Sequence, residues 1–481
     1  MTGVSVTTKV APASWDRGAV WLSYLYALFA ALILGHFLLG IPIQLSDSFG
    51  NMLKLSVSWP ELLYNEFTQR AYLRPLLWAE LKVVYDLSGG NYSLWFRGTH
   101  VVQVVALALL YVAIVRPQTR RDAALIPFGI AVLFGMHTFS GTVSEAFPIN
   151  TFLTILLFSF AAMYVALAEY RWWHDLAAAL LFAGAALTVE SGLLVWVIVV
   201  GARLVGARGV SRGGIAVLVA LLAVYFGLRF LVLNVGAPGL EERSSGFGFD
   251  ILEPDELIAR FGANPVGFYA YNILASALSV LVSEPSDGVF VLTRAIRQGS
   301  VDLSMFVKPI ATLSVTALLG VFAWRRRHVW LSRRFDRDDR LVLIFGMVLA
   351  ANAVISYPYT KDVIVSVAGA LFAVAAFAAA RHTLAWLPET LPRHRVAGTM
   401  LIALVSVAWS LQAAARHVEL RSAAYAQRQR WAYAELTLED ELRRFDARER
   451  ALFRTLRDEA LFARPEPPPL DLRLGALLRT E

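Results

Sequence analysis

Seven side chains that could do chemistry stand beside apolar runs: Asp47, Arg74, His137, Glu145, Glu190, Tyr359 and Lys361. Asp47 follows an apolar run by only a few residues, and a carboxylate next to a low-dielectric wall can act as a general base or a metal ligand. On position alone, Asp47 is better explained as the N-cap of a helix after Ser48. Glu145, in a later loop, is the second acid that we expect to work with Asp47.

Two basic residues are candidates for holding a phosphate. Arg74 precedes Pro75 and an apolar stretch, where it could contact a phosphate or, as an interfacial arginine, extend to lipid headgroups. Lys361 follows Tyr359 in a polar hairpin, residues 356–362, between two apolar runs. A lysine at a helix start, with backbone N–H groups nearby, could hold an anionic group.

Two further residues are expected to be structural. Glu190 stands between two short apolar runs, where it would satisfy neighbouring polar groups inside a bundle. His137 has no His or Glu three or four residues away, so its surroundings lack the spacing of a helical metal site. The absence of cysteine excludes disulfides, thiolate nucleophiles and Cys-ligated metals. Whether any other metal site exists stays unknown from the sequence.

The elements that carry these residues must lie in a membrane. Of the 481 residues, 57% are hydrophobic, against about 45 to 50% in a soluble globular chain. Because a span needs roughly 20 apolar residues, or fewer when buried among other helices, we predict an all-α bundle of about eleven spans. They cover residues 19–43, 99–115, 123–139, 149–167, 176–189, 193–205, 214–233, 306–324, 341–355, 363–380 and 396–413.

The arginines predict the orientation of this bundle. They gather in five clusters, at residues 116–121, 171, 203–212, 325–333 and 381–395, which all fall on one side if the N-terminus is cytoplasmic. The formal charge of +7 therefore reflects loop positions and predicts no nucleic-acid surface. Residues 176–205 are divided at Glu190 into two short spans, because a carboxylate at mid-membrane would be costly. Residues 266–282 are placed in or near the outer interface, because another span would move residues 325–327 outside.

The outer face then carries the long segments, residues 44–98, 140–148, 234–305 and 356–362, and the tail from Arg416. We predict a cytoplasmic N-terminal tail over residues 1–18, a transmembrane domain over 19–415 with helices in its outer loops, and a C-terminal helical tail over 416–481. The first span is too long for a cleaved signal peptide. Apolar residues recurring after Thr437 predict an amphipathic helix that ends near Pro465, more simply packed on the membrane domain than binding a partner.

Taken in chain order, these pieces form a pattern that has a known counterpart. Its parts are Asp47, Arg74-Pro75-Leu76, Gly90-Asn91, Met136-His137, Glu145, Val189-Glu190 and Tyr359-Thr360-Lys361-Asp362. In this order and spacing, over roughly residues 19 to 380, the chain resembles the GT-C superfamily of membrane glycosyltransferases. The bacterial members related to protein O-mannosyltransferases are the nearest likeness. The chain departs from them in having Asp47-Ser48 for two adjacent acids, Val189 for a lysine and Lys361 for an arginine.

The resemblance implies a transferase that uses a polyprenyl-phosphate sugar at the outer face of the bacterial cytoplasmic membrane. Asp47 would take the proton of an acceptor hydroxyl as it attacks the anomeric carbon with inversion, while Arg74, Lys361 and Tyr359 would stabilise the departing lipid phosphate. Glu145 would orient the acceptor or share a divalent cation with Asp47, and Glu190 and His137 would support the site. The acceptor would be a glycan, a lipid or a protein, within membrane lipids, and no cofactor is certain.

Two other classes of function stay open. A lipid or glycan transporter or flippase would show ionisable residues or broken helices inside its spans, and Arg229 is the clearest residue of that kind. A non-catalytic membrane scaffold would use the tail helix as its interaction element, with Asp47 as a helix cap only. Turnover that depends on Asp47 would separate an enzyme from both.

Overall fold

The computed structural model describes residues 16–69, 73–144, 150–234, 243–247, 251–283, 288–390 and 395–462. Every element in these ranges is helical. The first half contains α1 Arg17–Leu39, α2 Asp47–Leu55, α3 Trp59–Gln69, α4 Pro75–Leu87, α5 Tyr92–Val115, α6 Arg120–Gly135, α7 His137–Ser144, α8 Asn150–Leu167, α9 Trp172–Ala186, η1 Glu190–Leu193, α10 Leu194–Leu204, α11 Arg212–Phe226 and the π-helical η2 Gly227–Val232. The second half contains α12 Pro254–Phe261, α13 Val266–Val282, α14 Val289–Gln298, η3 Leu303–Phe306, α15 Val307–Leu331, α16 Arg337–Ile355, α17 Ser366–Thr390, α18 Arg395–Ala432, α19 Ala434–Thr437, α20 Glu439–Arg444 and α21 Ala447–Phe462.

The prediction of an all-helical membrane protein is confirmed. Within the described residues, six helical stretches are long and apolar enough to cross a bilayer: Arg17–Leu39, Tyr92–Val115, Arg212–Val232, Leu303–Leu331, Ser366–Trp386 and Gly398–Ala432. Two bent pairs raise the number to eight if each is one span, α6 with α7 at 65° and α12 with α13 at 101°. Each of the eleven predicted runs overlaps a helix, although residues 123–139 cross the break between α6 and α7 and residues 214–233 continue from α11 into η2. The count of eleven spans stays a prediction.

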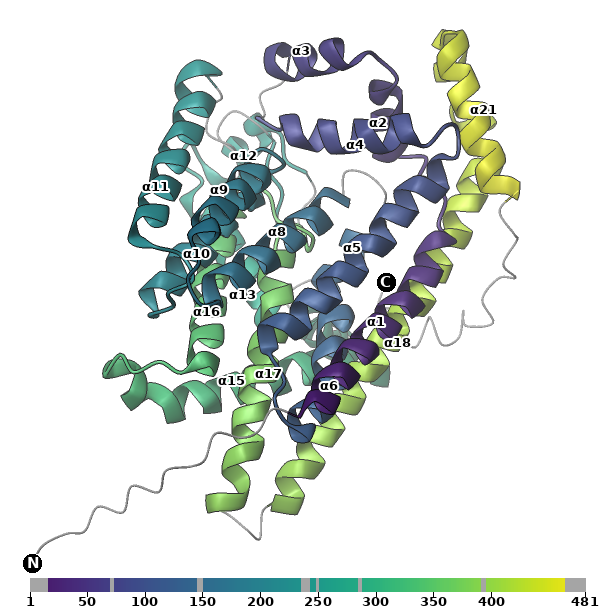
Figure 1. The fold of residues 1–481 in the computed structure, drawn as a ribbon. Coiled ribbons are helices and arrows are strands. Elements are labelled where there is room, and N and C mark those ends of the chain that lie inside the picture. The colour runs from purple at the N-terminus through teal and green to yellow at the C-terminus, as the bar shows by residue number, and fades with distance from the viewer. Residues whose placement is uncertain are drawn as a thin grey trace, which may run out of the picture.

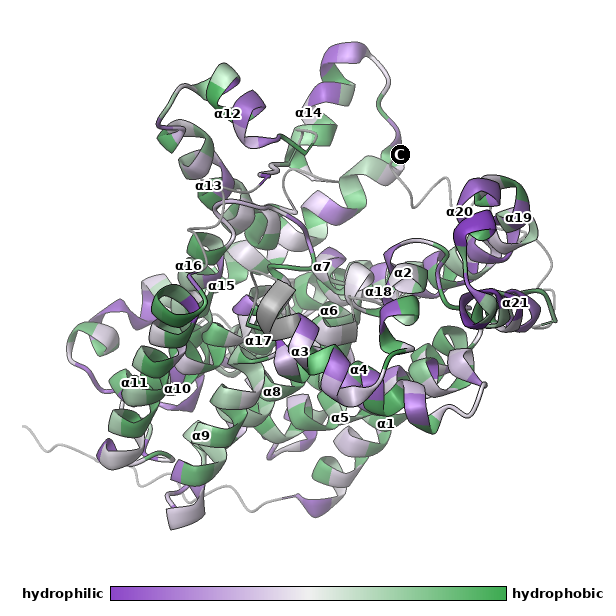
Figure 2. Cartoon of the chain, turned by 90° about the horizontal axis from the view of Figure 1, so that it is seen from above, coloured by the Kyte–Doolittle hydropathy of each residue, from purple (hydrophilic) through white to green (hydrophobic). Residues whose placement is uncertain are grey.

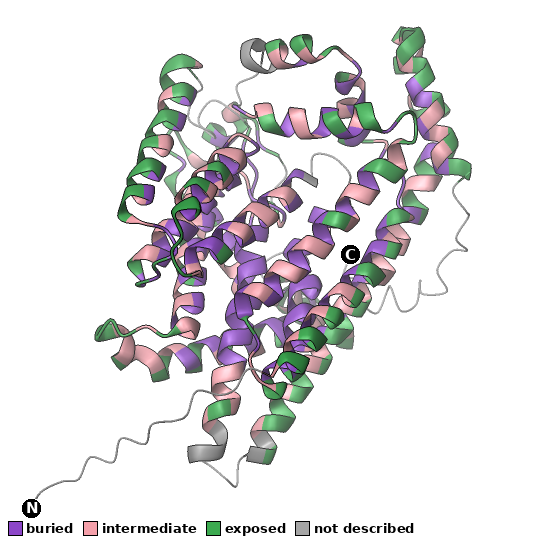
Figure 3. Ribbon diagram, viewed as in Figure 1, coloured by how far each residue is buried: buried purple, intermediate pink, exposed green. Residues whose placement is uncertain are grey.

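The α17 helix is the centre of the bundle. Residues 367–380 of α17, rich in alanine, are buried all round, as expected of a helix enclosed by protein on every side. It packs most extensively against α16, α6 and α15, and Figure 3 shows the buried residues concentrated in the middle of the bundle. Close packing needs small residues: a Cβ at Gly369 would lie 2.0 Å from the Thr138 hydroxyl of α7.

The two segments that the sequence left ambiguous have different outcomes. Residues 176–205 form two helices, α9 and α10, separated by a turn that begins at Glu190, which confirms the predicted break. The second segment, α13, packs on the bundle, and its place in or near the outer interface stays a prediction. It packs along α16 and α15 and buries Asn272, Ser276 and Ser279. Asn272 donates to the Ser245 and Tyr357 carbonyls, and Ser279 contacts His137.

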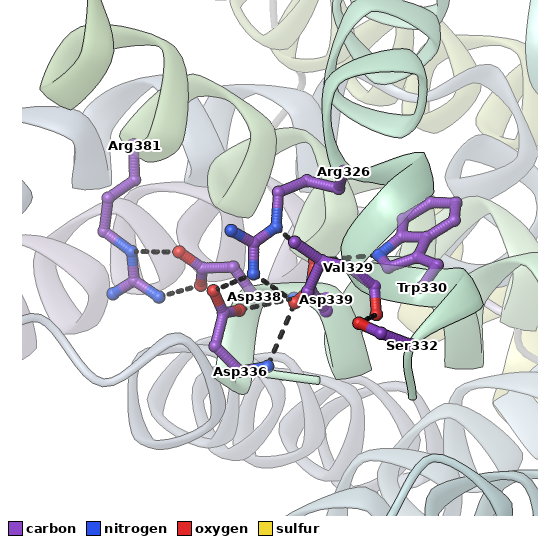
Figure 4. A network of polar contacts seen from close by, with 8 residues as sticks. All are labelled: Arg326, Val329, Trp330, Ser332, Asp336, Asp338, Asp339 and Arg381. Atoms are coloured by element: carbon purple, nitrogen blue, oxygen red, sulfur yellow. Dashed lines mark hydrogen bonds and ion pairs between the residues drawn. The ribbon is translucent and has the colours of Figure 1, made fainter. Parts of the chain in front are cut away.

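The predicted arginine clusters meet at one end of the bundle, which we call the arginine-rich end. Figure 4 shows its central network, where Arg326 of α15 contacts Asp336 and Asp339 at the start of α16, with Nε donating to Asp339 Oδ1 at 2.8 Å. Arg381 of α17 pairs with Asp338 and donates from Nη1 to the Val115 carbonyl at 3.1 Å. These ion pairs fix the ends of α15, α16 and α17 to one another and to the end of α5.

The opposite end carries the helices of the first long loop, and we call it the loop-helix end. Figure 1 shows α3 and α4 lying across the ends of the long helices there, beside α2 and α21, and Figure 2 shows the same helices from above. A second hydrophobic cluster joins α2 and α4 to α18 and α21. Its residues include Phe49, Leu81, Trp431, Phe453 and Leu456. Trp431 Nε1 also donates to the Ile43 carbonyl at 2.6 Å.

The helices at the C-terminal side of the bundle differ from the predicted ones in two places. The helix that carries the last predicted span does not end near residue 413, because α18 continues without a break to Ala432. The predicted boundary between the membrane domain and the tail therefore falls inside one helix and stays a prediction. The predicted amphipathic helix from Thr437 is two helices, since α20 stops before Phe445 and α21 begins at Ala447. The apolar stripe of α21 nevertheless packs on the loop helices as the simpler interpretation expected, burying Leu452, Phe453 and Leu456.

Candidate functional site

An ion-pair cluster around Glu190 joins three segments at the loop-helix end. Glu190 opens the turn between α9 and α10, Arg74 immediately precedes α4, and Arg229 lies in η2. Arg74 Nη2 lies 2.5 Å from Glu190 Oε2, and Arg229 Nη1 lies 2.8 Å from Glu190 Oε1. Arg229 Nη1 also donates to the Tyr225 hydroxyl at 3.0 Å. A single carboxylate thus holds two guanidinium groups from distant parts of the sequence.

The protonation state of Glu190 follows from these partners. Its side chain is 22% exposed, Arg74 is 28% exposed and Arg229 is 4% exposed. Burial alone would raise the pKa of Glu190, but the charges of Arg74 and Arg229 outweigh it and lower that pKa from 4.5 to about 2. The carboxylate is therefore ionised at every physiological pH.

Replacing Glu190 with glutamine is expected to destabilise the fold by about 3 kcal/mol, because breaking a buried pair leaves uncompensated charge on Arg229. The measurement is thermal unfolding in detergent, followed by tryptophan fluorescence. In the wild type, the depressed pKa means that this stabilisation is present above pH 4.5 and is lost as the pH falls toward 2. Arg229→Met in the Glu190→Gln background should recover part of the loss. An unchanged unfolding temperature in Glu190→Gln would contradict the assignment.

The hairpin between α16 and α17 forms a second polar group with α7 and α13. His137 Nε2 and Ser279 Oγ are hydrogen-bonded at 2.9 Å. Asp362 Oδ1 lies 3.3 Å from Ser279 Oγ and 3.7 Å from His137 Nε2. His137 and Ser279 are buried and Asp362 is half-buried. Three elements that are far apart in sequence thus place an imidazole, a hydroxyl and a carboxylate together.

The same hairpin is held by hydrogen bonds from Ser245 and Asn272 to its backbone carbonyls. Ser245 donates its N–H to the Pro358 carbonyl at 3.1 Å, and Asn272 Nδ2 donates to the Tyr357 carbonyl at 2.8 Å. Burial raises the pKa of the Tyr357 hydroxyl, and the charge of Arg229 opposes that rise. The charge of Arg229 thus acts on the hairpin at Tyr357.

The predicted phosphate ligands of the hairpin are close to each other but separate from Arg74. Lys361 is exposed, and its Nζ lies 5.0 Å from the centre of the Tyr359 ring, which stabilises the ammonium through a cation–π contact. The structure records no contact of either residue with Arg74 among the described residues. The three residues predicted to bind one phosphate thus stand in two groups.

Asp47 is the first residue of α2, so the prediction that it caps a helix after Ser48 is wrong. The cap position belongs to Ser46. Asp47 is exposed and makes no side-chain hydrogen bond or ion pair with the described residues. Its carboxylate in the first turn is favoured by the helix dipole. The buried side of α2 carries Phe49 and Met52 into the second hydrophobic cluster, which leaves Asp47 facing outward.

Arg97 joins the segments that carry the two predicted acids. It is fully buried near the start of α5. Its Nε donates to the Ile41 carbonyl at 2.9 Å and its Nη2 donates to the Ser144 carbonyl at 3.0 Å. Gln44 Nε2 donates to the same Ser144 carbonyl at 2.7 Å. The chain just before Asp47 and the chain just before Glu145 are therefore fixed side by side, although Glu145 itself lies outside the described residues.

The structure thus assembles some of the predicted site and adds residues that the sequence did not indicate. Arg74 and Glu190 meet, whereas His137 joins Asp362 beside Lys361. Sequence reasoning missed the pairing of Arg229 with Glu190, although an arginine within a span is itself a signal. It also missed Ser279 and Arg97, because one serine in an apolar helix and one arginine near a helix start have ordinary explanations.

Within the described ranges, no three His, Cys, Asp or Glu side chains are grouped so that they could hold a metal ion. Comparison of the chain with protein-family models, curated protein sequences and solved structures finds no match.

Proposed function

We propose that this protein is a GT-C-like membrane glycosyltransferase, which moves a sugar from a polyprenyl-phosphate donor to an acceptor hydroxyl. In this proposal the chain crosses the bacterial cytoplasmic membrane about eleven times, with the short apolar helices counted as buried spans. The arginine-rich end faces the cytoplasm, as basic loops do, and the loop-helix end faces outward. The acceptor is a glycan, a lipid or a protein.

One observation carries the proposal: Arg97 holds the segment before Asp47 beside the segment before Glu145, at the end where helices cover the bundle. Two acid-bearing loops fixed together are what a transfer site needs if one acid activates the acceptor and the other orients it.

The reaction assigns a role to each group. Asp47 takes the proton of the acceptor hydroxyl, the oxygen attacks the anomeric carbon from the face opposite to the phosphate, and the bond to the phosphate oxygen breaks with its electron pair. The departing polyprenyl phosphate gains negative charge, and for Arg74 and Lys361 to stabilise it together the phosphate must bridge the two groups in which they stand. Glu190 positions Arg74, because a guanidinium with several N–H donors can contact a carboxylate and a phosphate together. Tyr359 contacts the phosphate beside Lys361, whose ammonium lies over its ring, and His137 supports the site.

The test is donor consumption by the purified protein in detergent. The protein is incubated with a panel of polyprenyl-phosphate hexoses and pentoses, and free polyprenyl phosphate is measured by mass spectrometry, together with any lipid that co-purifies. Release of polyprenyl phosphate from one donor, in proportion to protein and absent after heat inactivation, supports the proposal. If every donor in the panel stays intact when acceptor hydroxyls are supplied, the proposal is rejected.

A transporter or flippase is the second candidate, and the shape of several helices favours it. The described part of the bundle contains two bent helix pairs, α6–α7 and α12–α13, and a π-helical segment that carries the buried Arg229. Discontinuous helices with an ionisable residue are typical of transport sites. Movement of a fluorescent polyprenyl-phosphate sugar across proteoliposomes, with its covalent structure unchanged, would favour this class over the transferase.

A further inference from the structure

A cavity of about 490 Å³ opens at the arginine-rich end and shares no lining residue with the site described above. It lies between the start of α1, the end of α5, the α8–α9 turn and the start of α16. Its basic lining residues come from three of these segments: Arg116 follows α5, Arg171 precedes α9 and Arg337 begins α16. This volume falls in the range of small-molecule pockets, about 300 to 1,000 Å³.

The charge of the lining is unbalanced. The three arginines face one carboxylate, Glu169, and one imidazole, His174, whose Nδ1 contacts the Gly209 carbonyl at 3.1 Å. Arg337 Nη2 donates to the Ile114 carbonyl at 2.7 Å, while its buried Nε has no hydrogen-bond partner among the described residues. Burial lowers the pKa of Arg337 to about 10, and the charges of Arg116 and Arg381 act in the same direction, while the carboxylate of Asp338 opposes them. An anion in the cavity would relieve this repulsion.

The other lining residues place the cavity at the level of lipid headgroups. Tyr24, Tyr164, Tyr170 and Trp173 line it, and Trp21 and Trp172 stand next to it with 69% and 75% of their surface exposed. Tyrosine and tryptophan gather at membrane–water interfaces, where their rings lie beside headgroups. Basic pockets between spanning helices at such a depth bind anionic lipid headgroups.

We propose that this cavity binds the phosphodiester headgroup of an anionic phospholipid, with Arg116, Arg171 and Arg337 contacting the phosphate and the aromatic residues contacting the glycerol and upper acyl chains. The site is separate from the proposed transferase site, so this inference does not depend on that function. A bound lipid would hold the start of α1 to the α8–α9 turn, and it would stabilise the arrangement of the arginine-rich end.

The test is native mass spectrometry of the detergent-purified protein titrated with dioleoylphosphatidylglycerol or dioleoylphosphatidylcholine. The wild type should bind phosphatidylglycerol preferentially. Each of Arg171→Gln and Arg337→Gln should weaken that binding about fivefold, because one interfacial arginine contributes about that factor. Arg337→Gln also removes the hydrogen bond from Arg337 to the Ile114 carbonyl of α5. Arg171 is exposed, so Arg171→Gln tests the cavity without that loss. Equal binding of the two lipids by the wild type would overturn the proposal.

A matched control removes the same charge outside the cavity. Arg208, Arg212 and Arg334 are exposed at the same end and do not line the cavity. Replacing any one of them with glutamine should leave the lipid preference unchanged, and a fivefold loss would show nonspecific charge attraction instead. Glycerol 3-phosphate is the soluble arm of the experiment. If it displaces phosphatidylglycerol at micromolar concentration, the cavity takes a free phosphate and the lipid assignment is wrong.

Discussion

Asp47→Asn is expected to lower donor turnover at least about 100-fold, because a general base contributes roughly 100- to 10,000-fold to such a step. Asparagine has nearly the same shape as aspartate but cannot accept the hydroxyl proton. The protein should stay folded, since Asp47 is exposed and has no side-chain hydrogen bond or ion pair with the described residues. Release of polyprenyl phosphate measures the effect, beside the unfolding temperature of the same preparation.

The control for this variant is Glu61→Gln, which removes an exposed carboxylate from α3, another helix of the same loop. Its turnover should equal that of the wild type. Normal turnover by Asp47→Asn would remove Asp47 from the mechanism. Equal losses in both variants would indicate that the charge of the loop matters, and not one base.

Arg97→Met is expected to destabilise the protein by at least about 3 kcal/mol, because a buried guanidinium that serves several carbonyls is replaced by a thioether that donates nothing. Arg97 donates to the carbonyls of Ile41, Pro42, Val143 and Ser144. Without it, the segments before Asp47 and Glu145 separate, so turnover should fall together with the unfolding temperature. Thermal unfolding and donor consumption on the same sample measure both effects.

Arg97→Lys separates the charge of Arg97 from its shape. A lysine keeps the positive charge but lacks the planar fork that reaches both segments, so it should recover only part of the stability. Arg121→Met, which removes an exposed arginine at the opposite end, should leave both measurements unchanged. An Arg97→Met protein with normal stability would show that other contacts fix the two loops.

The sequence predicts the helices well because burial in a bilayer requires long apolar runs and continuous backbone hydrogen bonding. The break at Glu190 was also predictable, because an ionised side chain inside a bilayer needs a partner or water. The length of α18 was not predictable, because no glycine or proline near residue 413 marks a helix end, and the helix continues until Trp431 packs with the loop helices.

Most of the candidate site could not be predicted, because its contacts join residues that no local pattern relates. Glu190 and Arg229 pair across 39 positions, and Arg74 and Glu190 across 116. Hydropathy identifies each segment but not which ends become neighbours. Asp47 is an example. The sequence shows that it follows the first span, but it does not show that Phe49 packs against Trp431 and so orients the helix α2 that begins at Asp47.

The contact between Trp431 and Ile43 has a consequence for the order of events during synthesis. The two residues are separated by 388 positions, and a ribosome adds roughly 5 to 20 residues per second. The first loop therefore leaves the translocation machinery roughly 20 to 80 seconds before its apolar partners in α18 and α21 exist. Until then its hydrophobic side has no native cover, so the nascent chain is exposed to chaperones and proteases at the surface where catalysis is proposed.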